Sequence, residues 1–442
     1  MLSHTGQNRF VFTAIALLII SMQFSCVRPS RTFDELPPGI WRAILMLDRQ
    51  PVQKYGDDRD IVKKFDFDSE LPFNFEVVYD HPDSNFHIII HNADERIKVD
   101  DIRFGRDLAT AKDTIEIRFP VYDSYIRAIY EDGVMEGEWV VNYRENYKIP
   151  FKAVFGQSHR FTNVANENTS DVSGKWAAVF SEGTEDAYPA IAEFEQKGNL
   201  VTGTFMTETG DFRYLDGQII GTKLYLSVFD GSHAWLFIAR INPDGTLSGV
   251  YRSGSHYTTD WFARRDADFK LNNPYSLTQP VSGEPMSFSF PDSKGNIVSL
   301  SDDNFRGKVK LIQIMGTWCP NCMDESRFLQ DYFNENPDEK IELISLAFER
   351  YKDKEKAMDA IRRYESKMNT SHPVLLAGNS NKADASAVLP QLSKIMSFPT
   401  LLFLDSENRI VKIHTGFNGP ATKEFVKFKS EFQQIIKELK KT

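Results

Sequence analysis

The chain has 442 residues, 41% of them hydrophobic, and a formal net charge of −10 at pH 7. This length predicts two or three domains, and the composition is typical of a globular protein rather than a disordered or membrane-spanning chain. The acidic balance leaves no surplus of Lys and Arg to neutralise phosphates, so we expect no nucleic-acid partner.

An apolar segment near the N-terminus predicts an export signal. The run VFTAIALLIISM, residues 11–22, has the length of a signal-peptide core and is short for a membrane span. The sequence QFSC then places Cys26 where a bacterial lipoprotein carries its lipid, although Phe24 and Ser25 depart from the usual residues. We expect a signal peptide over 1–25 and an extracytoplasmic lipoprotein anchored through Cys26, on the periplasmic side or the cell surface of a bacterium. An uncleaved anchor or an ordinary signal with a chance cysteine is the alternative.

Strand-like segments dominate the next two hundred residues. They are rich in β-branched and aromatic residues and are bounded by Asp, Asn, Gly and Pro, as is typical of β-strands. Because no helical periodicity interrupts them, we predict antiparallel β structure of barrel or sandwich type. The clearest segments are FEVVYD (75–80), FHIIIH (86–91), DTIEIRFPVYD (113–123), GEWVVNY (137–143), LVTGTFMT (200–207), GTKLYLSVFD (221–230) and AWLFIARI (234–241).

Three pairs of similar segments indicate that this region contains two copies of one module. GIWRAIL resembles GKWAAVF, FPVYDS resembles LSVFDG, and EDGVMEGEW resembles PDGTLSGVY. The pairs occur in the same order along the chain, which indicates a repeat. We therefore predict tandem β modules over residues 33–160 and 170–268, related by duplication.

The pattern changes after the second module. A stretch rich in Pro, Ser, Asn and Gly predicts a linker over 269–285. In the remainder, 286–442, strands alternate with helices, which predicts an α/β domain with helices on both faces of a central sheet. The expected elements are a hairpin (286–300), strands at 308–316, 341–349, 401–405 and 410–416, and helices after residue 322 and at 354–368 and 422–439.

The motif GTWCPNC, residues 316–322, carries two of the three cysteines in the chain. Cys319 follows a buried strand and begins a helix, where free N–H groups and the helix dipole stabilise a thiolate. We therefore predict that Cys319 attacks and that Cys322, one turn further, resolves the mixed disulfide. If Cys26 carries lipid, the redox disulfide within the mature chain must join Cys319 and Cys322.

A metal site is the alternative use of two cysteines at this spacing. Structural zinc needs two further ligands, and no other cysteine remains after export. The close histidine pair, His87 and His91, lies on an expected strand, where this spacing separates the two side chains by about 13 Å. We therefore expect no metal and no other cofactor.

The C-terminal motifs resemble a known family. WCPNC, the acidic Glu325 three residues later, and FPT (398–400) before an apolar strand are similar to the thioredoxin-like, TlpA- and ResA-type thiol–disulfide oxidoreductases, which are related to redoxins. The resemblance covers about the last third of the chain. It implies a thioredoxin-like fold, a cis-proline at Pro399 facing the dithiol, and a Phe398 backbone that binds the substrate peptide.

The same resemblance implies a role for Glu325 in tuning the protonation of the dithiol. Thioredoxin has a buried Asp six residues before its first cysteine, and Gln313 stands there in this chain, which leaves Glu325 as the best-placed proton carrier. Glu349 is a weaker second candidate. An exposed Glu325 that makes a helix-surface ion pair is the alternative. We expect Trp318 to shield the site and contact substrate.

These features predict a disulfide reductase or isomerase of exported proteins, recharged by a membrane electron donor and active in cell redox homeostasis. Pro-Asn between the cysteines lacks the His of strongly oxidising CPHC relatives, which favours a reductant. A peroxiredoxin-like peroxidase is one rival, but Gly316 occupies the place of its peroxide-orienting Thr, and Thr317 is one residue off. The other rival is a lipoprotein whose β modules bind a ligand or peptide and whose redox domain is secondary.

Overall fold

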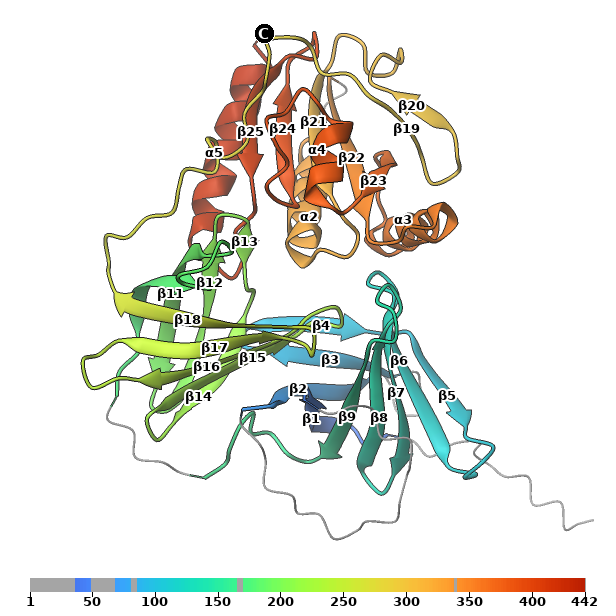
Figure 1. The fold of residues 1–442 in the computed structure, drawn as a ribbon. Coiled ribbons are helices and arrows are strands. Elements are labelled where there is room, and N and C mark those ends of the chain that lie inside the picture. The colour runs from blue at the N-terminus through green and yellow to red at the C-terminus, as the bar shows by residue number, and fades with distance from the viewer. Residues whose placement is uncertain (1–35, 49–67, 81–85, 165–169, 338–339, 442) are drawn as a thin grey trace, which may run out of the picture.

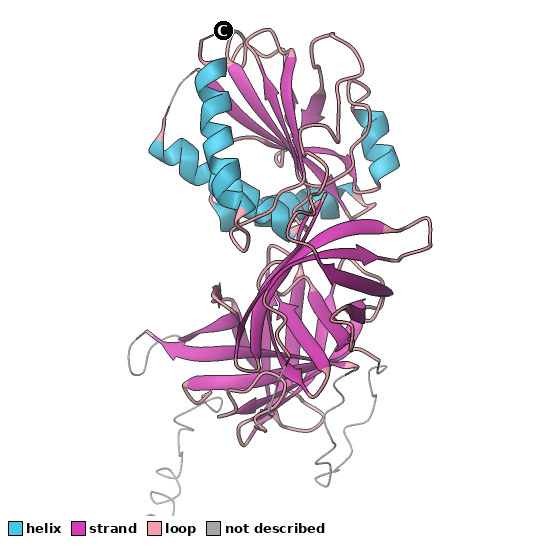
Figure 2. Ribbon diagram, turned by 90° about the vertical axis from the view of Figure 1, so that its left-hand side faces the viewer, coloured by secondary structure: helices cyan, strands magenta, loops and turns pink. Residues whose placement is uncertain are grey.

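The computed structural model describes residues 36–48, 68–80, 86–164, 170–337 and 340–441. Two β modules lie below a C-terminal α/β region in Figure 1, and Figure 2 shows that the described helices belong to that region. The predicted signal peptide and Cys26 lie outside the described residues. Within the described ranges, no helix combines the length and apolar character needed to cross a membrane.

Module 1 is a nine-stranded antiparallel sheet in the order β4-β3-β2-β1-β9-β8-β7-β6-β5. Its first and last strands pair with each other, so consecutive hairpins run outward from a central β1–β9 pair. The strands are β1 (Gly39–Met46), β2 (Glu70–Tyr79), β3 (Phe86–Asn92), β4 (Glu95–Val99), β5 (Ile102–Arg106), β6 (Asp113–Phe119), β7 (Ser124–Glu131), β8 (Val134–Val141) and β9 (Lys148–Phe155).

Module 2 is a second antiparallel sheet, and pairing of β11 with β12 closes it into a barrel. Closure gives the backbone groups of these strands partners that an open edge would lack. The order is β11-β10-β18-β17-β16-β15-β14-β12-β13. The strands are β10 (Gly174–Phe180), β11 (Tyr188–Lys197), β12 (Leu200–Thr207), β13 (Gly210–Asp211), β14 (Leu215–Ile220), β15 (Lys223–Phe229), β16 (Ala234–Ile241), β17 (Leu247–Ser253) and β18 (Tyr257–Arg265).

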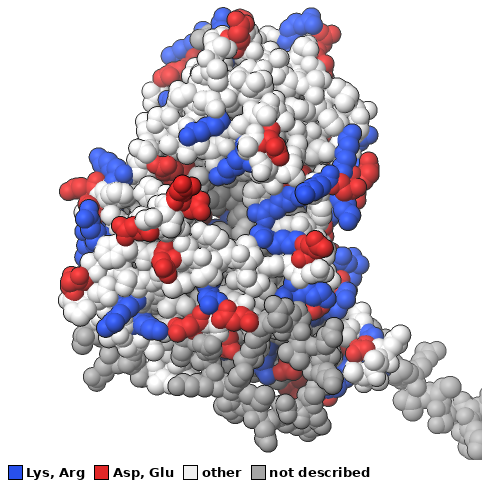
Figure 3. Space-filling model, in the orientation of Figure 1, with Lys and Arg blue, Asp and Glu red and all other residues white. Residues whose placement is uncertain are grey.

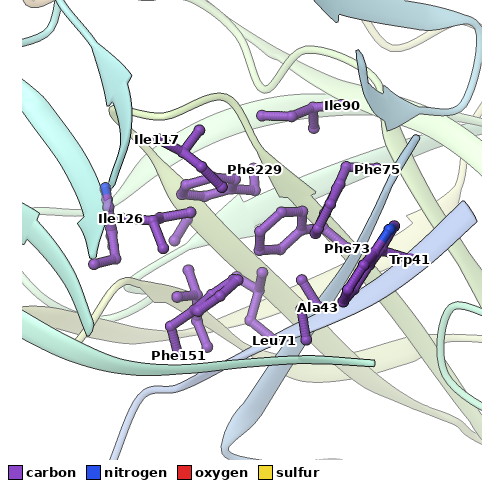
Figure 4. Close-up of a cluster of buried hydrophobic side chains, with 14 of the residues drawn as sticks. Trp41, Ala43, Leu71, Phe73, Phe75, Ile90, Ile117, Ile126, Phe151 and Phe229 are labelled. Atoms are coloured by element: carbon purple, nitrogen blue, oxygen red, sulfur yellow. The ribbon is translucent and has the colours of Figure 1, made fainter. Parts of the chain in front are cut away.

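Side chains of module 2 join the hydrophobic core of module 1, while the barrel interior of module 2 forms a core of its own. Phe229, from β15 of module 2, lies among the side chains of module 1, with its ring 4.4 Å from that of Phe73 and 5.2 Å from that of Trp139 (Figure 4). Buried Arg160, between the modules, donates to Ser227 of module 2 and to the backbone oxygen of His91 of module 1. Burial of apolar surface across this junction ties the modules together.

The first strands of the two modules have equivalent surroundings. β1 pairs with β2 and β9, and β10 pairs in the same way with β11 and β18. Trp41 donates its indole N–H to Pro37 O, and Trp176 donates to Val172 O, each four residues back. These matches support the predicted duplication, which stays a prediction.

The C-terminal region is a five-stranded mixed sheet in the order β23-β22-β21-β24-β25. Leu311 of β21 packs in one cluster with Phe432 of α5, and Ile312 packs in another with Ile361 of α3, so helices cover both faces as predicted. The elements are β19 (Ser289–Pro291), β20 (Ile297–Ser299), β21 (Val309–Met315), α2 (Pro320–Glu335), β22 (Ile341–Glu349), α3 (Lys354–Met368), β23 (Val374–Asn379), α4 (Lys382–Val388), β24 (Thr400–Leu404), β25 (Ile410–Thr415) and α5 (Glu424–Leu439). The predicted fold class of β modules followed by an α/β region is confirmed.

Candidate active site

Cys319 lies between the end of β21 and the start of α2, where it caps the helix. Its sulfur accepts a hydrogen bond from the backbone N–H of Cys322 at 3.3 Å, and Pro320 occupies the first helical turn. A thiolate at this position receives a backbone N–H bond and the favourable end of the helix dipole. The structure therefore gives Cys319 the surroundings that the sequence predicts for an attacking cysteine.

Cys322 has different surroundings one turn further along α2. Both thiols are free and buried, but Cys322 is fully enclosed whereas Cys319 retains 5% exposure. Burial raises the pKa of the Cys322 thiol well above its ordinary value, because the apolar interior penalises the thiolate. The protonated, inner position of Cys322 fits the predicted resolving role, which stays a prediction.

Glu325 lies on the buried face of α2 and not on the helix surface. Burial raises its pKa to about 8, and a hydrogen bond from Gln313 Nε2 to Oε2 at 2.9 Å opposes that rise. Its other carboxyl oxygen has no hydrogen-bond partner among the described residues. An acid held mostly protonated near neutral pH is suited to exchanging a proton with a nearby group.

Gln313 is fixed by a polar network that sequence reasoning did not find. Its side-chain oxygen accepts hydrogen bonds from the hydroxyls of Ser326 and Ser345, at 3.1 and 3.0 Å. These donors orient the amide so that its NH₂ group faces Glu325 and the backbone oxygen of Cys322. The available signal was two single polar residues, Gln313 and Ser345, each with apolar neighbours in its own strand.

A second buried carboxyl group, Glu349, holds the loop before the cysteines. It accepts hydrogen bonds from the backbone N–H and the hydroxyl of Thr317, at 3.0 and 2.9 Å. Burial raises the pKa of Glu349 to about 7. Trp318 is tied to the same strand, because its indole N–H donates to the Phe348 backbone oxygen at 2.9 Å. Glu349 therefore holds the dithiol loop in place through Thr317.

The Phe398–Pro399 segment completes the dithiol site. Its peptide bond is cis, and the Phe398 backbone oxygen accepts a hydrogen bond from the Cys319 thiol at 3.3 Å. The Phe398 ring lies 5.7 Å from that of Trp318. The structure thus brings together Trp318, Cys319, Phe398 and Pro399, and the predicted substrate-binding role of this group stays a prediction.

On one side, the dithiol loop is covered by residues 208–213 of module 2, which comprise the turn after β12, strand β13 and the two residues after it, and which we call the β12–β13 turn. The Ser397 hydroxyl donates to Thr209 O at 2.8 Å, and Asn321 Nδ2 donates to Asp211 O at 3.2 Å. Arg213 forms ion pairs with Glu95 of module 1 and with Asp324 of α2. This turn, which no sequence motif singled out, spans the cis-proline segment and the start of α2.

The other side of the dithiol loop borders a small cavity between module 1 and the α/β region. Its walls include Tyr143 of module 1 together with Trp318, Glu349 and Arg350 of the α/β region. The guanidinium carbon of Arg350 lies 4.0 Å from the centre of the Trp318 ring. Module 2 reaches this place through Ser232, whose hydroxyl donates to Trp318 O at 3.4 Å.

The histidines considered as metal ligands lie elsewhere. His87 lies 3.3 Å from Asp80, and His91 lies 3.6 Å from Glu76, both on the β2–β3 hairpin of module 1. Over the described ranges, no group of three or more His, Cys, Asp or Glu side chains is arranged to hold a metal ion.

Residues 282–427 match the Redoxin family. The thiol-disulfide oxidoreductase ResA of Halalkalibacterium halodurans is 23% identical over 154 residues, which cover 35% of this chain and 76% of that protein. The thioredoxin-like protein YneN of Bacillus subtilis is 27% identical over 129 residues, covering 29% of this chain and 68% of that protein. Among solved structures, a thiol-disulfide oxidoreductase from Bacteroides fragilis matches 34% of this chain and 98% of its own, at 19% identity and a TM-score of 0.25.

Proposed function

We propose that this chain, whose C-terminal region is a redoxin domain similar to ResA-type thiol–disulfide oxidoreductases, is a membrane-anchored, extracytoplasmic enzyme that reduces or isomerises the disulfides of exported proteins. The observation that carries the proposal is the paired environment of its two thiols. Cys319 caps α2 at the edge of the site, and Cys322 lies fully buried one turn further with Glu325 on the same helix. Cys26 is the proposed lipid anchor.

The proposed exchange begins at Cys319. Its thiolate attacks one sulfur of the substrate disulfide, the substrate S–S bond breaks, and the other substrate sulfur leaves as a thiolate that takes up a proton. Cys322 then loses its proton and attacks the sulfur of Cys319 in the mixed disulfide. This step forms the Cys319–Cys322 disulfide and releases the second substrate thiol. Two electrons have passed to the substrate, and a membrane donor must return two to the enzyme.

Glu325 is the proposed proton carrier for the second step. With a pKa raised to about 8, roughly a tenth of its carboxyl groups are ionised at pH 7 and can accept the Cys322 proton. Gln313 holds the carboxyl through Oε2, and Oε1 remains without a partner among the described residues. Trp318, Phe398 and Pro399 form the proposed substrate-binding surface over Cys319.

The peroxidase rival gains no support from the site. Thr317 is the residue nearest to the position of a peroxide-orienting Thr, and its hydroxyl donates to Glu349 at 2.9 Å. That hydroxyl is therefore committed to holding the loop. Disulfide exchange needs only the two thiols and a proton carrier, which the site brings together.

The midpoint reduction potential of the Cys319–Cys322 pair tests the proposal. Protein that starts after Cys26 is equilibrated in glutathione and dithiothreitol buffers, and free thiols are counted. We expect a value at or below about −270 mV, as for a thioredoxin-like reductant. A value near −120 mV would reverse the direction of electron flow. Failure to form the disulfide, in protein whose Cys319→Ser and Cys322→Ser variants fold normally, would contradict the dithiol mechanism.

A further inference from the structure

Two arginines beside the dithiol lie over aromatic rings. The guanidinium carbon of Arg350 is 4.0 Å from the centre of the Trp318 ring and 5.0 Å from that of Tyr143. Arg144 lies over the same tyrosine at 5.8 Å and over Tyr147 at 5.3 Å. A guanidinium held against aromatic faces keeps its N–H groups available for hydrogen bonding.

Within the described part of the chain, no carboxylate forms an ion pair with either of these guanidinium groups. The neighbouring Arg363, by contrast, pairs with Asp123 at 3.0 Å. The guanidinium of Arg350 is partly removed from water, and this burial lowers its pKa. A desolvated guanidinium without an anion is unfavourable, and a bound carboxylate would relieve that cost.

Two histidines of module 2 lie at the same place and add hydrogen-bonding groups rather than charge, because burial lowers the pKa of His256 to about 4 and lowers that of His233 as well. His256 Nδ1 lies 3.1 Å from the Tyr147 hydroxyl, and His233 lies 3.4 Å from Asp230. The acidic groups here already have partners: Asp230 also accepts backbone N–H bonds from residues 232 and 233, and Glu349 accepts two bonds from Thr317. Arg144 and Arg350 therefore keep N–H groups that no carboxylate of the described residues takes up in an ion pair, although Glu349 lies close enough to Arg350 to offset part of its charge.

This group of residues, which we call the arginine cleft, is defined by residues from all three parts of the chain. Module 1 and module 2 are joined there by a hydrogen bond between the hydroxyls of Tyr143 and Ser232 at 3.2 Å, and Ser232 donates to Trp318 O. Figure 3 shows a hollow between the redoxin domain and the β modules, bordered by Lys and Arg on one side and by Asp and Glu on the other. The members of the cleft are Tyr143, Arg144, Tyr147, His233, His256, Trp318 and Arg350.

We propose that the arginine cleft binds carboxylate side chains of an acidic polypeptide and so selects, among disulfides, those flanked by Asp or Glu for attack by Cys319. Arg350 touches Trp318, the residue directly before Cys319, so a segment bound in the cleft passes beside the attacking sulfur. The opposite side of the dithiol loop is covered by the β12–β13 turn. Guanidinium groups recognise carboxylates through paired N–H···O bonds, which gives the cleft its chemical preference.

The inference rests on the proposed disulfide exchange but can be tested without turnover. The probes are two blocked peptides of equal length without cysteine, one rich in Glu and one rich in Lys. Binding to the reduced protein, starting after Cys26, is measured by calorimetry. We expect the Glu peptide to bind at least about tenfold more tightly than the Lys peptide, because one charge-assisted hydrogen-bonded pair changes an affinity by about this factor. We expect this preference to fall about tenfold in an Arg144→Met/Arg350→Met double variant and to weaken with added salt.

Arg306→Met is the matched control, because Arg306 is an exposed arginine paired with Asp303 away from the cleft. It should leave the preference unchanged. Equal binding of both peptides to the wild-type protein, or a preference that survives in a double variant with normal circular dichroism, would overturn the inference. If the double variant does not fold, loss of the wild-type preference at high salt supports the inference, and its persistence overturns it.

Turnover separates this inference from the proposed function. Two disulfide-linked peptides, one with Glu and one with neutral residues beside the cysteines, are offered to the reduced enzyme. Reduction of both at equal rates contradicts the role of the arginine cleft and leaves the proposed reductase intact. If the Glu peptide binds preferentially but neither peptide is reduced, the result contradicts the proposed reductase activity and leaves the arginine cleft as a binding site.

Discussion

The two sides of the dithiol loop use arginine in opposite ways. On the side covered by module 2, Arg213 is 5% exposed and pairs with Glu95 of module 1 and Asp324 of α2. On the other side, Arg350 lies over Trp318 and Tyr143 and has no carboxylate partner within the described ranges. Both residues bridge the redoxin domain and the β modules.

The two arginines therefore have different uses: Arg213 stabilises the fold through ion pairs, whereas the charge of Arg350 stays available for binding. A buried guanidinium between two carboxylates is fully committed, and removing Arg213 would leave Glu95 without its cation and Asp324 with Arg327 alone. A guanidinium held by aromatic rings is positioned without being neutralised. We therefore expect substitutions on the covered side to affect mainly stability and substitutions on the open side to affect mainly binding.

The largest expected effect comes from Arg213→Met. It leaves Glu95 without its cation and Asp324 with Arg327 alone, and it removes a positive charge close to the buried Asp211, which should cost about 3 to 5 kcal/mol of folding free energy. Thermal unfolding of the reduced protein checks this loss. The uncoupled turn should also let a thiol reagent reach Cys319 faster. A variant with wild-type stability and wild-type Cys319 reactivity would show that the ion pairs do not hold the covered side closed.

The pH dependence of stability reports on Glu325, the buried acid beside the dithiol, independently of the arginines on the two sides of the dithiol loop. The folded-state pKa of Glu325 is raised to about 8, above its unfolded value, so the folded protein holds the proton more strongly and wild-type stability falls as pH rises from the unfolded pKa towards 8. Glu325→Gln removes this dependence. Between pH 6 and pH 8, we expect the variant to gain about 2 kcal/mol relative to wild type.

Urea unfolding followed by helical circular dichroism is the appropriate measurement, because the described helices, α2 to α5, all lie in the C-terminal α/β region, which contains Glu325. Parallel stability curves for the two proteins across this pH range would show that Glu325 is not held protonated. A second readout is the rate of mixed-disulfide resolution, which should lose its rise with pH in the Gln variant if Glu325 accepts the Cys322 proton.

Gly210→Ala tests how closely the β12–β13 turn covers the dithiol loop. Gly210 has φ +141°, and an added Cβ would lie 1.9 Å from Asn321 Nδ2 at the start of α2. We expect a loss of about 1 to 2 kcal/mol and faster alkylation of Cys319, because the turn must move away. Gly183→Ala is the control: Gly183 also has positive φ, at +80°, but has open space around it. If both variants leave alkylation unchanged, the turn does not limit access to Cys319.

The sequence predicted the parts of this molecule that depend on local patterns. β22 and α3 have the predicted bounds, because the first is a continuous apolar run and the second a long amphipathic segment. β23 and α4 were not predicted. β23 is short and is stabilised by parallel pairing with β22, and α4 has only seven residues and depends on its Asn381 cap. Such elements follow from tertiary contacts more than from their own composition.

The same distinction applies to the site. Cys319, Cys322 and Glu325 share one helix, so their spacing was enough to bring them together, and the FPT motif located the segment that faces them. Arg213 and Tyr143 lie more than a hundred residues from Cys319 and reach it through the packing of the β modules. Their positions follow from how the modules dock, which no local pattern encodes.

The smallest expected change in stability comes from Arg350→Met. The unbranched Met side chain can still pack between Trp318 and Tyr143, and removing a desolvated charge that has no carboxylate partner within the described residues offsets the lost cation–π contacts. We therefore expect a change within about 1 kcal/mol. Thermal unfolding beside Arg213→Met checks the contrast. A loss of stability as large as that of Arg213→Met would mean that Arg350 is also a structural clamp, and the two sides of the dithiol loop would then not differ in kind.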